Sequence, residues 1–253
     1  MNQFMVNSCD QSIVISVVSH GHAKFVNEFL NSLLKCNLSA VKRVVLTINK
    51  PESISYLNNK KFPFILDVRE NKISLGFSEN HNRALNGAGE DIYCIINPDV
   101  EMIEENSFII LAKEMSSTNV GLLYPIQISE EGVIQDSERS VPSPWNLFLR
   151  YLTKTKEKRI DWVNAAFWMI PQSVWLKLNG LNEKYFMYCE DVDFCLRLHL
   201  KKIPIIKSSV CIRHVGQRDS HRRVKNYFFH VHSLIRLWCS STYWRFLKSI
   251  KNA

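Results

Sequence analysis

The sequence predicts an α/β fold in which a largely parallel central sheet is flanked by helices. Short runs of β-branched residues alternate with segments of helical periodicity over the first hundred residues, and this alternation is typical of a parallel sheet with helical crossovers. The first run, at residues 13–19, is almost continuously apolar, as expected for a strand that is buried on both faces. In such sheets ligands bind beyond the carboxyl ends of the strands.

Four early strands are expected, at residues 13–19, 44–48, 64–68 and 92–96. A helix should follow the first strand, because apolar residues recur at helical spacing between Phe25 and Leu34. Polar residues lie at or just after the four strand ends: Ser19, Asn49, Asn71 and Asp99. We therefore expect a polar site at this edge of the sheet.

The later part of the chain carries weaker signals. Further helices are expected from within residues 82–86 and at 108–115, 174–178 and 191–200, with strands at 162–170 and 203–206. Residues 129–160 are polar and irregular, and they are expected to form a mobile loop.

Composition narrows the class of protein and of partner. The hydrophobic content of 46% is ordinary for a globular protein, but the formal charge of +8 implies an anionic partner such as a nucleotide or a membrane surface. The seven cysteines include no Cys-x-x-Cys pair, which argues against a zinc ribbon and suits a reducing compartment. No signal peptide and no apolar run of membrane-spanning length is evident, so a cytoplasmic location is expected.

Residues 218–253 differ from the rest and are separated here as a C-terminal helical segment, after a main domain at residues 1–217. The segment holds eight Lys and Arg residues against one acid, Asp219. Apolar residues between Val224 and Trp238 recur at helical spacing. A basic amphipathic helix with tryptophans can lie in a membrane interface, and such a stripe can equally pack on the protein core.

Three acids, Glu190, Asp191 and Asp193, lie within four positions among apolar and aromatic residues. On a helix, Asp193 and Arg197 are four residues apart and should pair. Asp191 would then be the unpaired acid at the helix start, held ionised by the helix dipole and able to accept a proton. A capped, charged helix N-terminus is the plainer alternative for all three.

Two further motifs follow strands. In Asn97-Pro98-Asp99, the carboxylate is a candidate ligand for Mg²⁺ or Mn²⁺, although such a sequence also forms an ordinary turn. His214 follows the last strand and is a candidate metal ligand or a structural histidine.

The segment from Leu75 to Leu85 combines Gly76 with Asn80 and Asn82 around a histidine. The glycine would permit close approach of the backbone to a ligand, and one asparagine could cap a helix.

Taken in order, these segments resemble the inverting family 2 glycosyltransferases of the GT-A fold, and most of all the rhamnosyltransferase-like branch of bacterial O-antigen synthesis. The resemblance covers about residues 12–216. It is carried by residues 17–20, 76–82, 97–99, 161–166, 185–193 and 214–216.

The resemblance implies a role for individual residues. Asp191 matches the catalytic base, Trp162 and Glu190 the acceptor side, and Asp99 the metal-binding position of the Asp-x-Asp motif, with His214 completing the metal or diphosphate site. The donor side would include Ser19, Asn49, Gly76, Phe77, Asn82, Asn97 and Asp99. The implied partners are a nucleotide-diphospho-sugar, with dTDP-rhamnose as a candidate, a polyprenyl-diphosphate-linked saccharide, and the anionic inner face of the cell membrane.

One position departs from the family pattern. Ile48 stands where many members carry an aspartate that reads the pyrimidine base. Base recognition would then fall to backbone groups, to Asp67 or to Arg69.

Three other classes of protein would show different sequence features. A nucleic-acid-binding protein should interleave basic and aromatic residues across a sheet face, whereas the early strands here are apolar. A nucleotidyltransferase would carry a glycine-rich, basic loop where this chain has Ser19-His20-Gly21-His22. A non-catalytic sugar-nucleotide-binding module would keep Asp99 but transfer no sugar.

Overall fold

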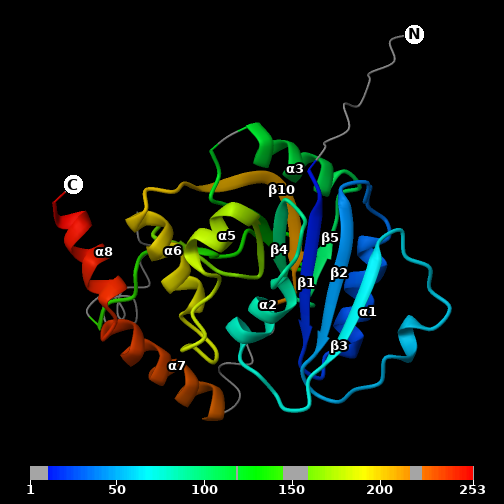
Figure 1. Cartoon of the computed structure of the whole chain (residues 1–253), viewed down its shortest axis with the longest axis horizontal. Helices are drawn as coiled ribbons and strands as arrows, with labels where there is room; N and C mark the ends of the chain where they lie inside the picture. Colours follow the sequence, from blue (N-terminus) through cyan, green and yellow to red (C-terminus); the bar gives the residue numbers. More distant parts are fainter. Residues whose placement is uncertain (1–10, 118, 145–158, 217–223, 253) are drawn as a thin grey trace, which may run out of the picture.

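The computed structural model describes residues 11–117, 119–144, 159–216 and 224–252, and it confirms the predicted α/β architecture (Figure 1). The strands are β1 (Ile13–Ser19), β2 (Val41–Ile48), β3 (Ile65–Glu70), β4 (Ile92–Ile96), β5 (Val100–Met102), β6 (Leu122–Ile128), β7 (Glu138–Arg139), β8 (Trp162–Val163), β9 (Phe167–Pro171) and β10 (Ile205–His214). The helices are α1 (Ala23–Leu33), the 3-10 helix η1 (Ser55–Leu57), α2 (Phe77–Leu85), α3 (Ser107–Ser117), α5 (Gln172–Leu178), α6 (Glu190–Leu200), α7 (Val224–Trp238) and α8 (Ser241–Lys251).

Eight strands form one mixed sheet in the order β3-β2-β1-β4-β9-β6-β10-β5. The pairs β1–β2, β2–β3, β1–β4 and β6–β10 are parallel, whereas β9 and β5 run antiparallel to their neighbours. The ends of β1, β2, β3 and β4 therefore meet at one edge of the sheet, where the sequence predicted a polar site.

Helices cover both faces of the sheet. Alternate residues of β1 point to opposite sides: Ile13, Ile15 and Val17 pack with α1 and α3, and Val14 packs with α2, α5 and α6. This double coverage explains why β1 and β4 consist almost entirely of buried residues.

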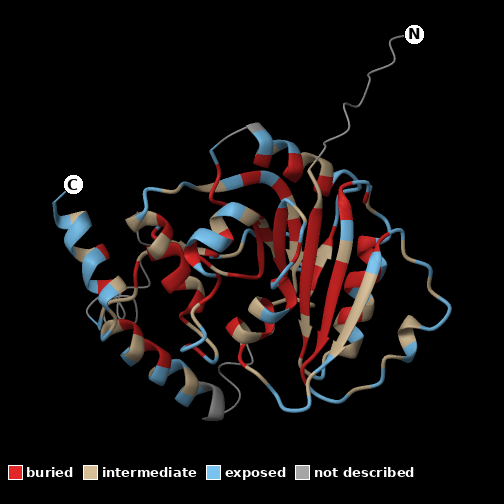
Figure 2. Ribbon diagram, in the orientation of Figure 1, coloured by how far each residue is buried: buried red, intermediate tan, exposed pale blue. Residues whose placement is uncertain are grey.

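A third apolar cluster joins the C-terminal segment to α6. Leu234 and Leu237 of α7 and Tyr243 and Phe246 of α8 are at most 9% exposed and pack with Val192 and Leu196 of α6. The two C-terminal helices lie at the end of the molecule opposite β3 and α1, and each carries one buried and one exposed side (Figures 1 and 2).

The apolar stripe predicted between Val224 and Trp238 is thus divided between two faces of α7. Leu234 faces the core, whereas Tyr227, Phe228 and Ile235 are more than half exposed. The basic residues Arg218, Arg222 and Arg223 lie outside the described residues. The division at residue 217 stays a prediction.

Several expected elements were placed wrongly or missed. The strand expected at 162–170 is two strands, β8 and β9, and the strand expected at 203–206 is the longer β10. Strand β6 was missed because it contains a proline. Its Pro125, which has no N–H to donate, lies opposite an irregularity in β10 between Lys207 and Cys211, where the ladder shifts register.

The irregular region expected at residues 129–160 includes the short strand β7, which pairs with β8. Residues 145–158 of the expected mobile loop lie outside the described residues.

Candidate active site

The two candidate metal ligands lie side by side, although they are more than a hundred residues apart in sequence. Asp99 follows β4, and His214 ends β10, where it pairs with Val100 of β5. The Nε2 atom of His214 is 3.5 Å from Oδ1 of Asp99, and both side chains are largely buried. This separation is too long for a good hydrogen bond.

The hydrogen bonds of Gln135 assign the tautomer of His214. The Gln135 amide nitrogen donates to the backbone carbonyl of His214 at 2.6 Å, which leaves its Oε1 as the acceptor, 3.0 Å from Nδ1 of the same histidine. Nδ1 therefore carries the proton in the neutral ring, and the lone pair of Nε2 faces Asp99. A histidine oriented by a second hydrogen bond in this way is typical of metal ligands.

Asp99 and His214 fit a divalent cation whose remaining ligands come from a substrate and water. No cluster of three or more His, Cys, Asp or Glu side chains suited to a metal occurs in the described part of the chain. Two protein ligands are enough for Mg²⁺ or Mn²⁺ when a diphosphate and water supply the other oxygens.

Asn49, which follows β2, stands at the centre of an amide network at the strand ends. Its Oδ1 accepts from Asn71 at 2.9 Å and from the Leu75 amide at 2.8 Å, and its Nδ2 lies 2.9 Å from both the Leu75 carbonyl and His20 Nδ1. Asn71 also donates to Asn80 at 2.7 Å. The network ties the ends of β2 and β3 to the start of α2, so the Asn49 amide shapes the site rather than presenting atoms to a ligand.

Other residues predicted for the donor side are also used within the protein. Ser19 is fully buried, and its hydroxyl accepts from the His22 amide at 3.1 Å. Asn82 donates to the Leu181 carbonyl and to Glu183, both at 2.8 Å, and accepts from the Leu181 amide. The donor role of these two side chains stays a prediction that this geometry does not support.

Gly76 is required for close approach, but the approaching group belongs to the protein. A Cβ at this position would lie 2.6 Å from the carbonyl oxygen of Phe186, and the Phe77 amide donates to that same oxygen at 2.8 Å. The glycine brings α2 against the turn that precedes Glu190, and the donor-side role of Gly76 stays a prediction.

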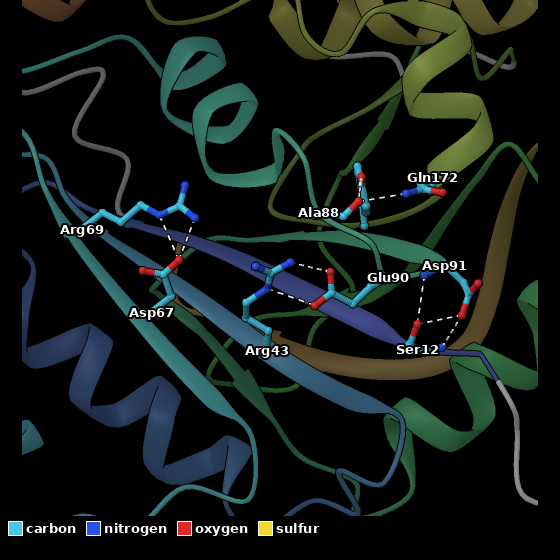
Figure 3. Close-up of polar contacts among 9 residues, drawn as sticks. Ser12, Arg43, Asp67, Arg69, Ala88, Glu90, Asp91 and Gln172 are labelled. Carbon is cyan, nitrogen blue, oxygen red and sulfur yellow. Dashed lines mark hydrogen bonds and ion pairs between the residues drawn. The ribbon is translucent and has the colours of Figure 1, made fainter.

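The candidate base-recognition residues Asp67 and Arg69 pair with each other on β3. Arg69 donates to Asp67 Oδ2 through Nε at 3.0 Å and through Nη2 at 2.6 Å (Figure 3). Arg69 also donates to the Arg83 carbonyl at 2.8 Å. Figure 3 also shows Arg43 paired with Glu90 nearby. Both arginines therefore stabilise this side of the sheet.

His81, which the sequence places between two asparagines, is a buried neutral residue. Its Nδ1 lies 2.8 Å from the Ser16 hydroxyl, and its ring packs against Phe77. Burial lowers its pKa to about 3, so the ring carries no charge at neutral pH.

The candidate catalytic acids begin α6 after an unusual turn. Tyr188 and Cys189 both adopt left-handed backbone conformations, with φ of 72° and 65°. Such conformations cost about 1–3 kcal/mol each in residues other than glycine, and they cluster at functional sites. Glu190 follows, only 7% exposed, and its Oε2 has no hydrogen-bond partner among the described residues.

Burial makes Asp191 a stronger base than the sequence predicted. Desolvation raises its pKa to about 6, against smaller opposing effects of the Val192 amide and of Arg139. Desolvation and the neighbouring Asp191 raise the pKa of Glu190 well above its usual range. Loss of hydration thus acts against the ionised form that the helix start favours, and a pKa of about 6 still leaves Asp191 ionised at neutral pH.

Asp193 has the structural role that its spacing indicates. Arg197 Nε donates to its Oδ2 at 2.8 Å, while the other guanidinium nitrogens donate to the Leu178 and Gly180 carbonyls. The predicted ion pair is confirmed, and it fixes α6 to the loop after α5.

Arg139 is the residue that sequence reasoning missed on this side. It stands opposite Trp162 in the β7–β8 pair, with its guanidinium 5.6 Å from the centre of the indole ring. Its charge acts on Asp191, and the Trp162 Nε1 donates to the Ser140 carbonyl at 2.9 Å. The sequence signal was weak because β7 has two residues.

The sequence is similar to those of known rhamnosyltransferases. Over 207 residues the chain is 25% identical to "Rhamnosyltransferase WbbL" of Escherichia coli, which covers 74% of this chain and 77% of that protein. It is 25% identical over 154 residues to the "N-acetylglucosaminyl-diphospho-decaprenol L-rhamnosyltransferase" of Mycobacterium tuberculosis, covering 49% of this chain and 50% of the relative. The chain is therefore a glycosyltransferase, similar in sequence to rhamnosyltransferases.

The fold agrees with this assignment. The structure of a mannosyltransferase from Pyrobaculum calidifontis, in complex with GDP-Man and Mn²⁺, superposes with a TM-score of 0.62 at 15% identity over 89% of this chain and 64% of that one. The glycosyltransferase thus has the predicted GT-A fold. No protein-family model matches the chain.

The described residues of the glycosyltransferase include no helix long and apolar enough to cross a membrane.

Proposed function

We propose that the glycosyltransferase moves a hexose from a nucleotide-diphospho-sugar to a polyprenyl-diphosphate-linked saccharide, with dTDP-rhamnose as the first donor to test. The names of the bacterial relatives support rhamnose as the sugar and a polyprenyl diphosphate as the carrier. The observation that carries the proposal is Asp191, a carboxylate with a pKa near 6 at the start of α6.

Asp191 has the properties that a general base needs. A pKa near 6 leaves it ionised at neutral pH yet more basic than an exposed aspartate. In the proposed reaction it takes the proton of an acceptor hydroxyl while that oxygen attacks the anomeric carbon. The bond from this carbon to the diphosphate breaks, the nucleoside diphosphate leaves, and the single displacement inverts the anomeric centre.

Asp99 and His214 would hold Mg²⁺ or Mn²⁺ at the donor diphosphate. Their 3.5 Å contact and the orientation of His214 by Gln135 support this role. A bound cation would neutralise charge on the leaving diphosphate.

Trp162, Arg139 and Glu190 would form the acceptor side around Asp191. The Arg139 guanidinium lies over the Trp162 ring, 5.6 Å from its centre, and the Arg139 charge lowers the pKa of Asp191. Burial raises the pKa of Glu190 well above its usual range, which favours a carboxyl group that can donate a hydrogen bond.

The C-terminal helices would bring this acceptor side to an anionic membrane. Tyr227, Phe228, Ile235 and Trp244 are each more than half exposed, and Arg245 and Lys248 of α8 are exposed as well. Aromatic and basic side chains together favour a membrane interface, at about 1 kcal/mol per basic residue near the surface.

Liposome binding tests the membrane role. Vesicles that contain anionic lipid should bind the full chain, less at high salt, and bind a Phe228→Ser/Trp244→Ser variant more weakly. Equal binding by both proteins would exclude these two residues from the contact.

A donor screen tests the proposed reaction. Nucleotide-sugars are incubated with and without Mn²⁺ and a polyprenyl-diphosphate-linked acceptor, and release of nucleoside diphosphate is followed. We expect release that needs metal, is stimulated by acceptor and falls at least about 100-fold in Asp99→Asn, the size of effect expected when a charge-stabilising group is lost. Donor binding without turnover under all conditions would instead indicate a non-catalytic binding module.

A further inference from the structure

One face of α7 lies directly on the turn that precedes the candidate base. The Ser233 hydroxyl donates to the backbone carbonyl of Met187 at 2.8 Å. About one helical turn before Ser233, the Phe229 ring stacks on Phe186 with ring centroids 5.0 Å apart. The neighbouring His230 ring meets the Tyr188 ring edge-on, with centroids 5.1 Å apart. Three successive residues of the turn thus contact α7.

The same turn is held from the other side by α2. The Phe186 carbonyl accepts from the Phe77 amide, and Gly76 leaves no room between the two backbones. The turn therefore lies between α2, which follows the end of β3, and α7, which belongs to the C-terminal segment.

This turn has little to stabilise it by itself. Two consecutive non-glycine residues, Tyr188 and Cys189, have positive φ. Within the described residues, the Cys189 side chain forms no capping hydrogen bond at the start of α6. Strained conformations of this kind persist only where the surrounding structure holds them. The contacts of α7 meet that need directly before Glu190 and Asp191.

Ser233 is also an unusual choice for plain packing. It is 3% exposed, between apolar residues that face the core. Its hydroxyl donates across to the Met187 carbonyl, whereas serines in helices commonly bond to a carbonyl of their own helix. Alanine would fill this place without a polar group that needs a partner.

We propose that α7 is part of the catalytic scaffold and that Ser233 is a positioning residue, which fixes the 186–189 turn so that Asp191 faces the acceptor hydroxyl. This inference rests on the proposed function, because it needs Asp191 to act as the base. It gives the C-terminal segment a role in turnover that is separate from membrane binding.

Four variants of the full chain test the proposal. Ser233→Ala removes the hydrogen bond, and Ser233→Thr keeps the hydroxyl. Phe229→Leu removes the stacked ring and leaves Ser233 in place. Ser249→Ala is the matched control, because Ser249 also donates to a backbone carbonyl, that of Phe246 at 2.7 Å, within α8 and away from the turn.

Transfer rate, donor affinity and the pH profile are measured for each variant, with the melting temperature as a check on folding. A misplacement of about 1 Å at a reacting group can lower turnover about 100-fold. We therefore expect Ser233→Ala and Phe229→Leu to lower kcat by about 10- to 100-fold, with donor Kd within about twofold of wild type and a shifted pH profile. Ser233→Thr should recover most of the loss in Ser233→Ala, and Ser249→Ala should behave as wild type.

The proposal is overturned if Ser233→Ala and Phe229→Leu keep kcat within about twofold of wild type, or if Ser249→Ala loses as much as they do. If kcat falls as far in Ser233→Thr as in Ser233→Ala, the hydroxyl of Ser233 does not position the turn. Failure of the proposed function looks different, because the wild-type chain would then transfer no sugar in the first place.

Discussion

The two sides of the strand-end site differ in how well their buried polar groups are hydrogen-bonded. On the side of β1 to β3, the Asn49 amide has its hydrogen-bonding groups satisfied within the protein, and Asn71 and Asn80 extend the same network. On the side of α6, a buried oxygen of Glu190 has no hydrogen-bond partner within the part of the chain that the structure describes, and the two residues before it have left-handed backbone conformations.

The difference indicates which side frames the substrates and which side reacts. A satisfied network of buried amides fixes loop geometry, and it gains nothing from a change of protonation. Buried, partly unsatisfied acids have raised pKa values and gain from a proton or a substrate hydroxyl. We therefore expect substitutions on the first side to affect stability, and substitutions on the second to affect turnover.

The largest effect is expected for Asp191→Asn. The substitution keeps the shape of the side chain but removes its basicity, and general base catalysis contributes about 10²–10⁴-fold. Initial rates of transfer at saturating donor and acceptor should fall by that factor.

Glu190→Gln is the matched comparison for that variant. Because burial raises the pKa of Glu190 well above its usual range and so favours its neutral form, a neutral amide should lower the transfer rate by no more than about tenfold, less than the loss expected from removing a general base. A larger loss than in Asp191→Asn would exchange the roles of the two acids.

Gly76→Ala should disturb both sides together, because its Cβ would lie 2.6 Å from the Phe186 carbonyl oxygen. Overpacking of this kind destabilises by about 1–3 kcal/mol, and movement of the turn should also lower kcat. Denaturant unfolding and transfer rates measure the two effects. Gly89→Ala is the control, since a Cβ there meets no atom within 4 Å; equal stability of the two variants would contradict the close contact.

Asn49→Ala tests the framing side. The substitution leaves the Leu75 amide and Asn71 without their acceptor, and an unsatisfied buried group costs about 1–3 kcal/mol. Urea unfolding should report that loss, while kcat at saturating donor changes little. Asn58→Ala at an exposed position serves as the control, and a large fall in kcat with unchanged stability would place Asn49 in the chemistry instead.

Arg139→Gln should give the smallest effect, a displacement of the pH profile. Asp191 must be deprotonated to act as a base, so kcat/KM should fall below about pH 6, the pKa set chiefly by burial. The Arg139 charge lowers that pKa, and its removal should move the acid limb to higher pH. Arg83→Gln, at an exposed arginine, should leave the profile unchanged; a shift to lower pH in Arg139→Gln would contradict the electrostatic assignment.

Much of the fold could be predicted because its strands are long and buried on both faces. The runs at β1 and β4, and the second half of β2, are mostly apolar and buried. Strand β6 could not be recognised in this way, because Pro125 argues against a strand and the register shift that accommodates it lies eighty residues away in β10.

The site was predictable where residue spacing decides the contact. The i,i+4 pair of Asp193 and Arg197 formed as expected, and Asp99 and His214 were both singled out, although their proximity depends on the pairing of β5 with β10. Sequence could not show that Gly76 contacts Phe186, that Gln135 orients His214, or that burial raises the pKa of Asp191. Each depends on contacts between distant segments.

The division between a framing side and a reacting side is tested most directly by Asp191→Asn, with donor affinity measured by calorimetry beside its transfer rate. The account predicts a donor Kd within about twofold of wild type together with a transfer rate lowered about 10²–10⁴-fold. Near-normal transfer, or a loss that follows entirely from weaker donor binding, would contradict the assignment of Asp191 as the base.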